Sequence, residues 1–336
     1  MSSAWLEAAD EHEAQELLHA LGCTDGLPVV VPTDARVAAM IAGGHDAAAT
    51  ILGVVEPRMG VATVESVAVN AVMAGCRPLH FPVVCAAVRA VCEPAFNLGV
   101  VQGTTHNAAP LVIVNGGPTD IASGTGALGP GHRANATIGR ALRLVLFNAG
   151  GGRPGAGDMA TLGQPAKFSF VVGENALDSP FPPLSATPAV TLIAVEGPSQ
   201  VMFVPVGDSP AADADRMLDM VVRTMLVPGS LAGMGYRGCA ALLLSPLHAD
   251  VFASAGYTRR SLQEAIFARA VIPAADIRRL HGHVRGAPST PDGATVHGLS
   301  SPHHLLIAVA GGAGTYSAVL CGLADGVGNI VTMPIT

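Results

Sequence analysis

Short apolar runs that end at glycine, proline or polar residues alternate with amphipathic segments along most of this chain. Such runs predict buried strands, and apolar residues spaced by three and four predict helices. Strands that alternate with helices are typical of a parallel or mixed sheet layered by helices. We therefore expect an α/β fold.

The pattern predicts elements of both kinds from end to end. The expected strands are Leu27–Val31, Ile51–Val55, Leu111–Val114, Lys167–Val172, Val190–Val195, Val201–Val206, Cys239–Leu244, Leu305–Ala310 and Asn329–Met333. The expected helices are Glu11–Leu21, one capped by Thr33 or Asp34 that runs to Ile41, Val61–Gly75, Phe81–Val91, Ala134–Phe147, Ala211–Leu226, one through Ala270 with a capping box of Ser261 and Glu264, and Thr315–Leu323. Val201–Val206 and Cys239–Leu244 with the helix between them read as a βαβ unit.

A proline-rich segment, Ser179–Pro188, divides the chain in two. It predicts an N-terminal α/β domain over 1–188 and a C-terminal one over 189–336. The runs Leu111–Gly117 and Leu305–Gly312 both lead an apolar strand into a double glycine. Two related halves would explain this likeness, as would the general form of turns between a strand and a helix.

Half of the 336 residues are hydrophobic and only 13% are charged. Strands buried on both faces and a large subunit interface would each give this balance, and we expect both, hence an oligomer. The net charge is −7 and no basic cluster occurs. Nucleic acid and anionic membrane surfaces are therefore not expected as partners.

The N-terminal segment 1–18 is acidic and lacks the features of a signal peptide, and no apolar run is long enough to span a bilayer. We expect a cytoplasmic protein. The six cysteines include no CxxC pair, so we expect thiols rather than disulfides and no metal site. The sequence indicates no particular cofactor.

Three glycine-rich loops follow predicted strands or helices and have the composition of ligand-binding loops: Asn115–Arg133, Asn148–Gly163 and Gly311–Gly314. No complete dinucleotide or phosphate-loop motif is present. Arg133 could hold a carboxylate, with His132 and Asn135 beside it. Gly311, Gly312 and Gly314, followed by Tyr316 and Ser317, are candidates for binding an anion or substrate. The other reading of such loops is a tight turn.

Lys167 is the only lysine among eighteen basic residues, the others being arginine. An amine can lose its proton when buried, whereas a guanidinium stays charged, so the retained lysine is a candidate for chemistry that arginine cannot perform. The alternative is chance retention.

Three further residues are catalytic candidates. Cys76 lies between Gly75 and Arg77, and a neighbouring cation favours a thiolate; the alternative is a small core residue. Glu65 lies on an apolar helix, where a carboxylate needs a partner or a solvated face. His106 is an acid–base candidate because imidazole titrates near neutral pH.

Several runs together resemble a known family. They are ATVESVAVNAVMAGCRP, QGTTHNAAPLVIVNG, GPGHRANATIGRALRL, DMATLGQPAKFSF, GEN and HLLIAVAGGAGTYSAV. They are similar to an uncharacterised bacterial family that accompanies UGSC-type (seleno)proteins as their larger companion subunit, and the likeness covers most of the chain from Asp25 onward.

The resemblance implies a hetero-oligomer with a small thiol or selenol partner protein. The residues that fall on the family's motifs are Glu65, Asn70, Cys76, Thr105, His106, Arg133, Asn135, Lys167, Glu174, Asn175, Gly311, Gly312, Gly314 and Ser317. Two positions depart from the family: His132 replaces a bulky aromatic residue, and Tyr316 replaces a histidine.

Three functions remain open at this point. The first is a cysteine-dependent enzyme that acts on a small polar or anionic metabolite by redox, lyase or addition chemistry. In it Cys76 is the thiolate, Glu65 and His106 move protons, and Lys167 and Arg133 hold the substrate. The second is a C–N hydrolase or hydratase that uses a Cys/Glu/Lys set. The third is a non-catalytic scaffold subunit of a larger enzyme.

Overall fold

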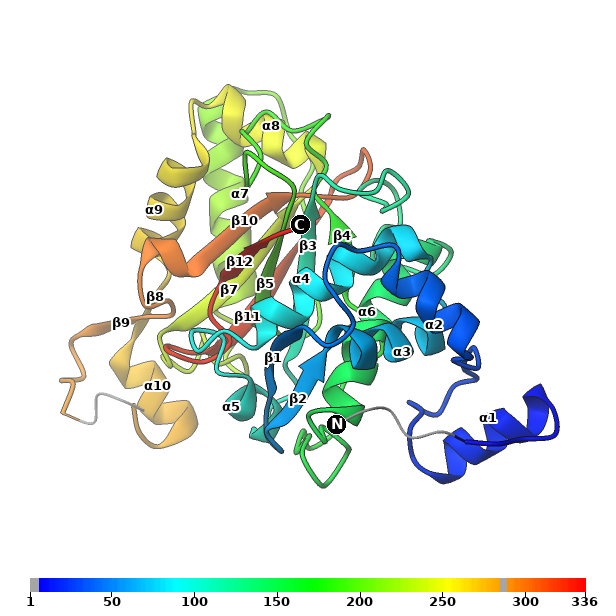
Figure 1. Ribbon diagram of the computed structural model, residues 1–336. Helices are drawn as coiled ribbons and strands as arrows, with labels where there is room; N and C mark the ends of the chain where they lie inside the picture. Colours follow the sequence, from blue (N-terminus) through cyan, green and yellow to red (C-terminus); the bar gives the residue numbers. More distant parts are fainter. Residues whose placement is uncertain (1–5, 285–288) are drawn as a thin grey trace.

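The computed structural model describes residues 6–284 and 289–336. Within them, the strands form one eight-stranded mixed sheet with helices on its outer faces, and two small two-stranded sheets (Figure 1). The α/β class expected from the sequence is confirmed. Residues 1–5 of the acidic N-terminal segment lie outside the described residues.

The helices are α1 (Glu11–Ala20), α2 (Asp34–Ile41), α3 (Val64–Ala74), α4 (Phe81–Val91), α5 (Leu98–Gly103), α6 (Arg133–Asn148), α7 (Pro210–Met225), α8 (Pro246–Ser254), α9 (Arg259–Arg269) and α10 (Ala274–His281), with short 3-10 turns η1 (Pro78–His80), η2 (Pro165–Lys167) and η3 (Pro302–His304). The strands are β1 (Ile51–Val55), β2 (Gly60–Thr63), β3 (Ala109–Asn115), β4 (Val171–Gly173), β5 (Ala189–Val195), β6 (Ser199–Met202), β7 (Gly238–Leu244), β8 (Val271–Pro273), β9 (Thr295–His297), β10 (Leu305–Val309), β11 (Tyr316–Ala324) and β12 (Val331–Pro334).

The large sheet has the strand order β10-β7-β11-β5-β3-β4, with β12 added to β5 and β6 added to β11. Two neighbouring pairs are parallel, β3 with β4 and β7 with β10, and the other pairs are antiparallel. Strands β6 and β7 both run antiparallel to β11, so they are parallel to each other with β11 between them. The predicted βαβ unit is present in this form, but its first strand is Ser199–Met202 and not Val201–Val206.

The sheet folds over so that its two wings face each other. Alternate side chains of β3, such as Leu111 and Ile113, share one buried cluster with Leu243 of β7 and Ala308 of β10. Strands β4 and β10 lie at opposite ends of the strand order, yet Asn175 after β4 donates its N–H to the carbonyl of Val309 in β10, so the sheet must fold over. The molecule therefore has four layers: helices, one wing (β12, β5, β3, β4), the other wing (β6, β11, β7, β10), and helices.

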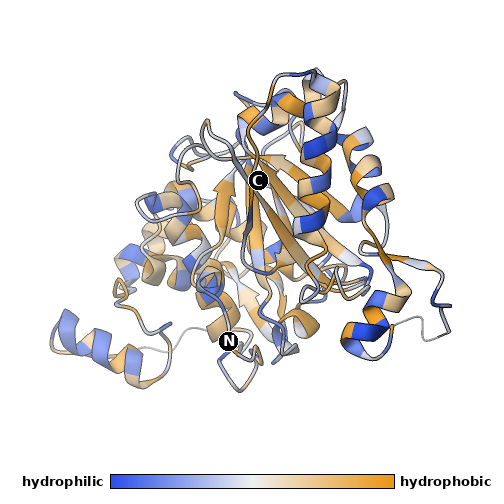
Figure 2. Ribbon diagram, turned by 180° about the vertical axis from the view of Figure 1, so that it is seen from behind, coloured by the Kyte–Doolittle hydropathy of each residue, from blue (hydrophilic) through white to orange (hydrophobic). Residues whose placement is uncertain are grey.

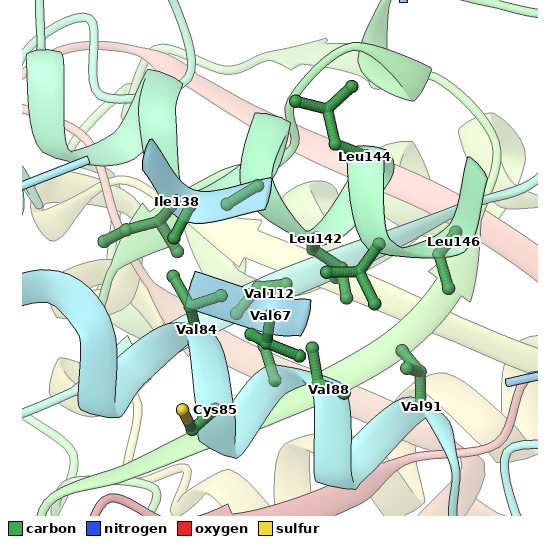
Figure 3. Packing of buried hydrophobic residues seen from close by; sticks show 14 of the residues in the cluster. Val67, Val84, Cys85, Val88, Val91, Val112, Ile138, Leu142, Leu144 and Leu146 are labelled. Atoms are coloured by element: carbon green, nitrogen blue, oxygen red, sulfur yellow. The ribbon is translucent and has the colours of Figure 1, made fainter. Parts of the chain in front are cut away.

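The outer faces of the two wings are covered by different helices. Val112 of β3 packs with Val84 and Val88 of α4 and with Ile138 and Leu142 of α6 (Figure 3). The second wing packs in the same way under α7, α8 and α9. Strands with apolar residues on both faces need this double cover, and Figure 2 shows them as the most hydrophobic part of the molecule.

The strand pairing repeats. In the first half, β3 pairs parallel with β4 and antiparallel with β5; in the second, β7 pairs parallel with β10 and antiparallel with β11. The halves also exchange a strand, because β6 follows β5 but pairs with β11, whereas β12 follows β11 but pairs with β5. This repeat matches β3 with β7 and β4 with β10. The sequence likeness of Leu111–Gly117 to Leu305–Gly312 joins β3 to β10, which occupy different places in the repeat.

One expected helix is a strand. The sequence predicts a helix over Thr315–Leu323, but Tyr316–Ala324 form β11, in the middle of the large sheet. Most of β11 is buried on both faces between neighbouring strands, so it lacks the alternation by which a strand is recognised.

Smaller differences concern the ends of elements. Leu27–Val31 forms no strand, and Val30 N–H donates instead to the carbonyl of Met73 at the end of α3. Of the expected strand Lys167–Val172 only the last part is extended into β4, since Lys167 ends a 3-10 turn. The segment Val61–Gly75 begins as strand β2 before α3 starts.

The capping box before Ala270 is formed by Thr258 and Ser261 rather than by Ser261 and Glu264. Glu264 pairs instead with Arg260 one turn earlier. The sheet runs across position 188, because β5 begins at Ala189 and pairs along the whole of β3. A domain boundary at this position stays a prediction.

Candidate functional site

The ends of strands from both wings meet at one place. Asn175, which follows β4, donates its backbone N–H to the carbonyl of Val309 at the end of β10 (2.8 Å). Gly311, which follows β10, donates to the carbonyl of Ser123 in the loop after β3 (2.7 Å). Carboxyl ends of parallel strands are where α/β proteins usually bind ligands. We call Asn115, Glu174, Asn175, Arg259 and Gly311 the strand-end cluster.

Glu174 is the centre of this cluster. Its side chain is 0% exposed, and it accepts hydrogen bonds from Asn115 Nδ2 (2.5 Å) and from the backbone N–H of Leu184 (3.0 Å). Arg259 Nη2 lies 3.3 Å from Glu174 Oε1 and supplies the only opposing charge paired with it in the described chain. A buried carboxylate with this many donors is fixed in position.

The guanidinium of Arg259 is held by Glu174 and Phe181, and its Nε–H has no hydrogen-bond partner among the described residues. It is the first residue of α9, its guanidinium lies 5.9 Å from the centre of the Phe181 ring, and its side chain is 18% exposed. Its Nε is buried and has no hydrogen-bond partner within the described residues. Burial lowers the pKa of Arg259 and Glu174 opposes this, but a guanidinium remains charged. A planar cation with unused N–H groups is suited to a carboxylate ligand.

Asn175 connects Glu174 to the glycine turn. Its Nδ2 donates to Asp178 Oδ2 (3.0 Å) and to the carbonyl of Gly311 (3.2 Å), while its Oδ1 accepts from the Asp178 N–H. Asp178 is exposed, so its carboxylate is held beside the cluster and open to solvent. It is the one acidic side chain of this group that a ligand could reach from outside.

The turn Gly311–Gly314 needs glycine at two positions for different reasons. Gly311 has φ of 89°, which favours glycine. A Cβ at Gly312 would overlap Thr125 Oγ1, so the turn packs directly against the loop after β3. A Cβ at Gly311 or Gly314 would meet nothing within 4 Å, so the backbone there is open on one side.

A buried Ser–His pair supports this turn from below. Ser245 Oγ donates to the carbonyl of Gly314 (2.8 Å), and Ser245 N–H donates to Ser317 Oγ (3.0 Å). His248 Nε2 lies 2.9 Å from the carbonyl of Phe203, which can only accept, so its Nδ1 accepts the Ser317 hydroxyl proton at 2.7 Å. Burial lowers the pKa of His248, in keeping with this neutral form. The pair has the atoms of a nucleophile and its base, but both side chains are buried beneath the turn.

Four further predicted residues have different exposures and partners. Tyr316 is exposed at the start of β11. His132 Nε2 lies 3.3 Å from the carbonyl of Thr125 in the loop after β3. Asn135 is structural: its side chain accepts from Ala122 N–H and donates to three carbonyls, which fixes the same loop. Arg133 is turned away and donates to the carbonyl of Gly75.

Cys76 lies outside this cluster. It is buried, its thiol donates to the carbonyl of Thr137 in α6 (3.2 Å), and burial raises its pKa to about 12 against the weaker opposing effects of Thr137 and Arg133. A thiol with this pKa is protonated near neutral pH. The arginine that follows it in sequence, Arg77, pairs with Asp120 and does not act on the thiol.

Lys167 and Glu174 lie at opposite ends of β4. Lys167 forms an ion pair with Asp158 of the second glycine loop (2.8 Å), and no ion pair or hydrogen bond within the described chain joins it to Cys76. Of the three predicted glycine-rich loops, Asn115–Arg133 and Gly311–Gly314 meet. The loop Asn148–Gly163 lies with Lys167 at the other end of β4, and Cys76 lies in separate surroundings against α6.

The other predicted residues are also dispersed. His106 Nε2 lies 3.6 Å from Glu196, and Thr105 accepts a backbone hydrogen bond from Thr161. Asn70 accepts from Asn148 Nδ2 (2.7 Å) inside the helical layer. Glu65 is in the first turn of α3 and half-buried.

Arg259 and Asn115 are the functional candidates that the sequence did not single out. Arg259 is 85 residues from Glu174. The Thr258 cap places this arginine at the start of a helix, but nothing in the sequence pairs it with Glu174.

No protein-family model matches the chain, and no curated protein matches it significantly. Across residues 6–284 and 289–336, no helix is long and apolar enough to cross a membrane, and no three histidine, cysteine or acidic side chains form a group able to hold a metal ion.

Proposed function

We propose that the protein is an enzyme that acts on a small anionic metabolite, and that the strand-end cluster binds its carboxylate through Arg259. The observation that carries this is the buried Nε of Arg259, which has no partner among the described residues although the guanidinium is charged and held in place by Glu174 and Phe181. A buried donor without a partner costs free energy that a bound acceptor would recover.

The surrounding groups suit acid–base chemistry on such a ligand. Asp178 is an exposed carboxylate held by Asn175, and the open backbone of Gly311 and Gly314 lies on the same turn. A positioned carboxylate can move a proton, and backbone N–H groups stabilise developing negative charge. This favours addition, elimination or hydrolysis over chemistry that needs a thiolate from Cys76.

The experiment is a calorimetric titration with succinate, malate and maleate against the wild-type protein and two arginine variants. We expect at least one of the three acids to bind, and Arg259→Gln to weaken its binding at least about tenfold, as for the loss of a charged hydrogen bond. Arg260→Gln is the matched control, because Arg260 is the next residue, its side chain is 78% exposed, and its ion-pair partner in the described chain is Glu264.

Binding that is equal in Arg259→Gln and the wild type would contradict the proposal, as would the absence of binding by all three acids. Lys167→Gln is included so that a ligand held at the other end of β4 is recognised. A ligand of the strand-end cluster should bind this variant as it binds the wild type.

A small thiol or selenol partner, which the family resemblance implies, belongs to this proposal as the source of any redox chemistry. Five of the six cysteines (Cys76, Cys85, Cys92, Cys239 and Cys321) have pKa values that burial raises to about 11 or 12. Cys76→Ala should therefore leave the activity of the assembled complex unchanged. Arg259→Gln should lower it; a pure scaffold subunit would keep full activity in both variants.

A further inference from the structure

A pocket lies around Lys167, at the end of β4 opposite the strand-end cluster. Its walls come from α5, β3, α6 and the glycine loop 149–163, and its internal space is about 30 Å³. That is room for about two water-sized groups. The pocket is distinct from the strand-end cluster in position and in the residues that line it.

The charges in this pocket do not cancel. Lys167 Nζ lies 2.8 Å from Asp158 Oδ2, and Arg143 Nη2 lies 3.1 Å from the same oxygen. All three side chains are largely buried, and two cations face one carboxylate. Burial alone would raise the pKa of Asp158, but the two cations together lower it, so the carboxylate is charged. One positive charge is left over, and an uncompensated charge in a buried place is costly.

The pKa of Lys167 is lowered, in keeping with the excess of positive charge in the pocket. Burial lowers the pKa of its amine, Asp158 opposes this, and Arg143 adds to the lowering. An anion in the pocket would relieve the repulsion between the two cations.

The pocket also contains a hydrogen-bond acceptor that has no donor among the described residues. Gln102 lines the pocket and is 4% exposed. Its Nε2 donates to the carbonyl of Glu56, which fixes the orientation of the amide, and its Oε1 is buried without a partner among the described residues. The Gly152 backbone of the glycine loop lies directly against this oxygen. A ligand that satisfies the pocket must therefore accept from cations and also donate a proton.

We propose that this pocket binds a small monoanion that carries a hydroxyl group, of the size of hydrogen carbonate. Its negative oxygens would accept from Lys167 and Arg143, and its O–H would donate to Gln102 Oε1. Arg143 also donates to the carbonyl of Gly152 (3.0 Å), so the bound ion would fasten the glycine loop to α6. The proposal does not depend on the function assigned to the strand-end cluster.

The test is thermal unfolding in 50 mM sodium hydrogen carbonate, formate or chloride at matched pH and ionic strength. For millimolar affinity we expect hydrogen carbonate to raise the Tm of the wild type by about 2–4 °C over chloride. Formate, which lacks the O–H, should raise it by less. Line broadening of ¹³C-labelled hydrogen carbonate measures binding directly.

Lys167→Gln should abolish both the shift and the broadening; Arg143 still pairs with Asp158 in this variant, which should therefore fold. Gln102→Leu should remove the preference for hydrogen carbonate over formate. Arg260→Gln, the control at the other end of β4, replaces an exposed arginine and should behave as the wild type. Equal shifts for all three salts, or a full shift in Lys167→Gln, would overturn the proposal.

Discussion

At the residue scale, the positions that carry charge into the interior are few and each is held by several partners. Glu174 has donors from a side chain, a backbone and a cation, and Asp158 has two cations. Such groups are held firmly in place. Replacing one of their partners leaves a buried charge uncompensated and lowers the free energy of unfolding.

Glu174→Gln tests how far Arg259 depends on its partner. The substitution keeps the shape but removes the charge that Arg259 faces, and it places an amide N–H₂ among donors. We expect the free energy of unfolding to fall by about 2 kcal/mol, measured by urea denaturation. Glu264→Gln, in an exposed pair, should change it by less than about 0.5 kcal/mol. Equal effects of the two variants would argue against a fixed Glu174–Arg259 pair.

Cys76 should react slowly. With its pKa raised to about 12, only a minute thiolate fraction exists at pH 7.5, and the side chain is buried. We expect alkylation by iodoacetamide, followed by peptide mass spectrometry, to be at least about a hundredfold slower in the folded protein than in urea. Comparable rates in the two states would restore Cys76 as a catalytic candidate.

At the element scale, the glycine turn before β11 sets the geometry of the site. Gly312→Ala introduces a methyl group where Thr125 already lies, whereas Gly314→Ala enters open space. We expect Gly312→Ala to lower the free energy of unfolding by about 1–3 kcal/mol and to weaken ligand binding. Gly314→Ala should keep the stability of the wild type, and a similar loss in both would show that the turn is not packed as described.

His248, which supports β11, should make stability depend on pH. Its folded pKa is lowered below 6.5, so its contribution is complete above pH 6.5 and is lost as pH falls, because the unfolded chain gains a proton that the folded one resists. We expect His248→Gln to reduce the slope of the unfolding free energy between pH 6.5 and 5 by up to about 1.4 kcal/mol per pH unit. His12→Gln, an exposed histidine, should leave the slope unchanged.

Many of the helices and strands could be predicted from the sequence. Helix α4 and strand β1 have the predicted bounds. Pro82 lies in the first turn of α4, and Glu56-Pro57 follows the last residue of β1. Strand β11 could not be recognised, since both its faces are buried and periodicity alone does not separate such a strand from a helix. The glycine turns were identified, but Arg259 reaches Glu174 through the fold and not through any sequence spacing.

At the scale of the whole molecule, the folded sheet explains why the site could be foreseen only in part. The strand ends that meet, β4 and β10, lie at opposite limits of the strand order. Only the folding of the sheet brings Asn175 to Val309. The same fold places Lys167 at the far end of β4, so a lysine and a glutamate seven residues apart form ion pairs in different surroundings.

The exchanged strands should make unfolding a single event. Because β6 completes one wing and β12 the other, neither half keeps its sheet when the other melts. We expect one calorimetric transition whose van't Hoff and calorimetric enthalpies agree. Two separated transitions, or a fragment 1–188 that folds alone with native-like stability, would favour the two-domain prediction instead.

The crossing of β6 and β12 also bears on how such a chain could have arisen. In each half the segment that follows the central strand pairs with the other half, β6 with β11 and β12 with β5. Two copies of a half-length chain with this topology would pair by swapping the same segment. An end-to-end fusion of such a symmetric pair would have the strand pairing of this protein.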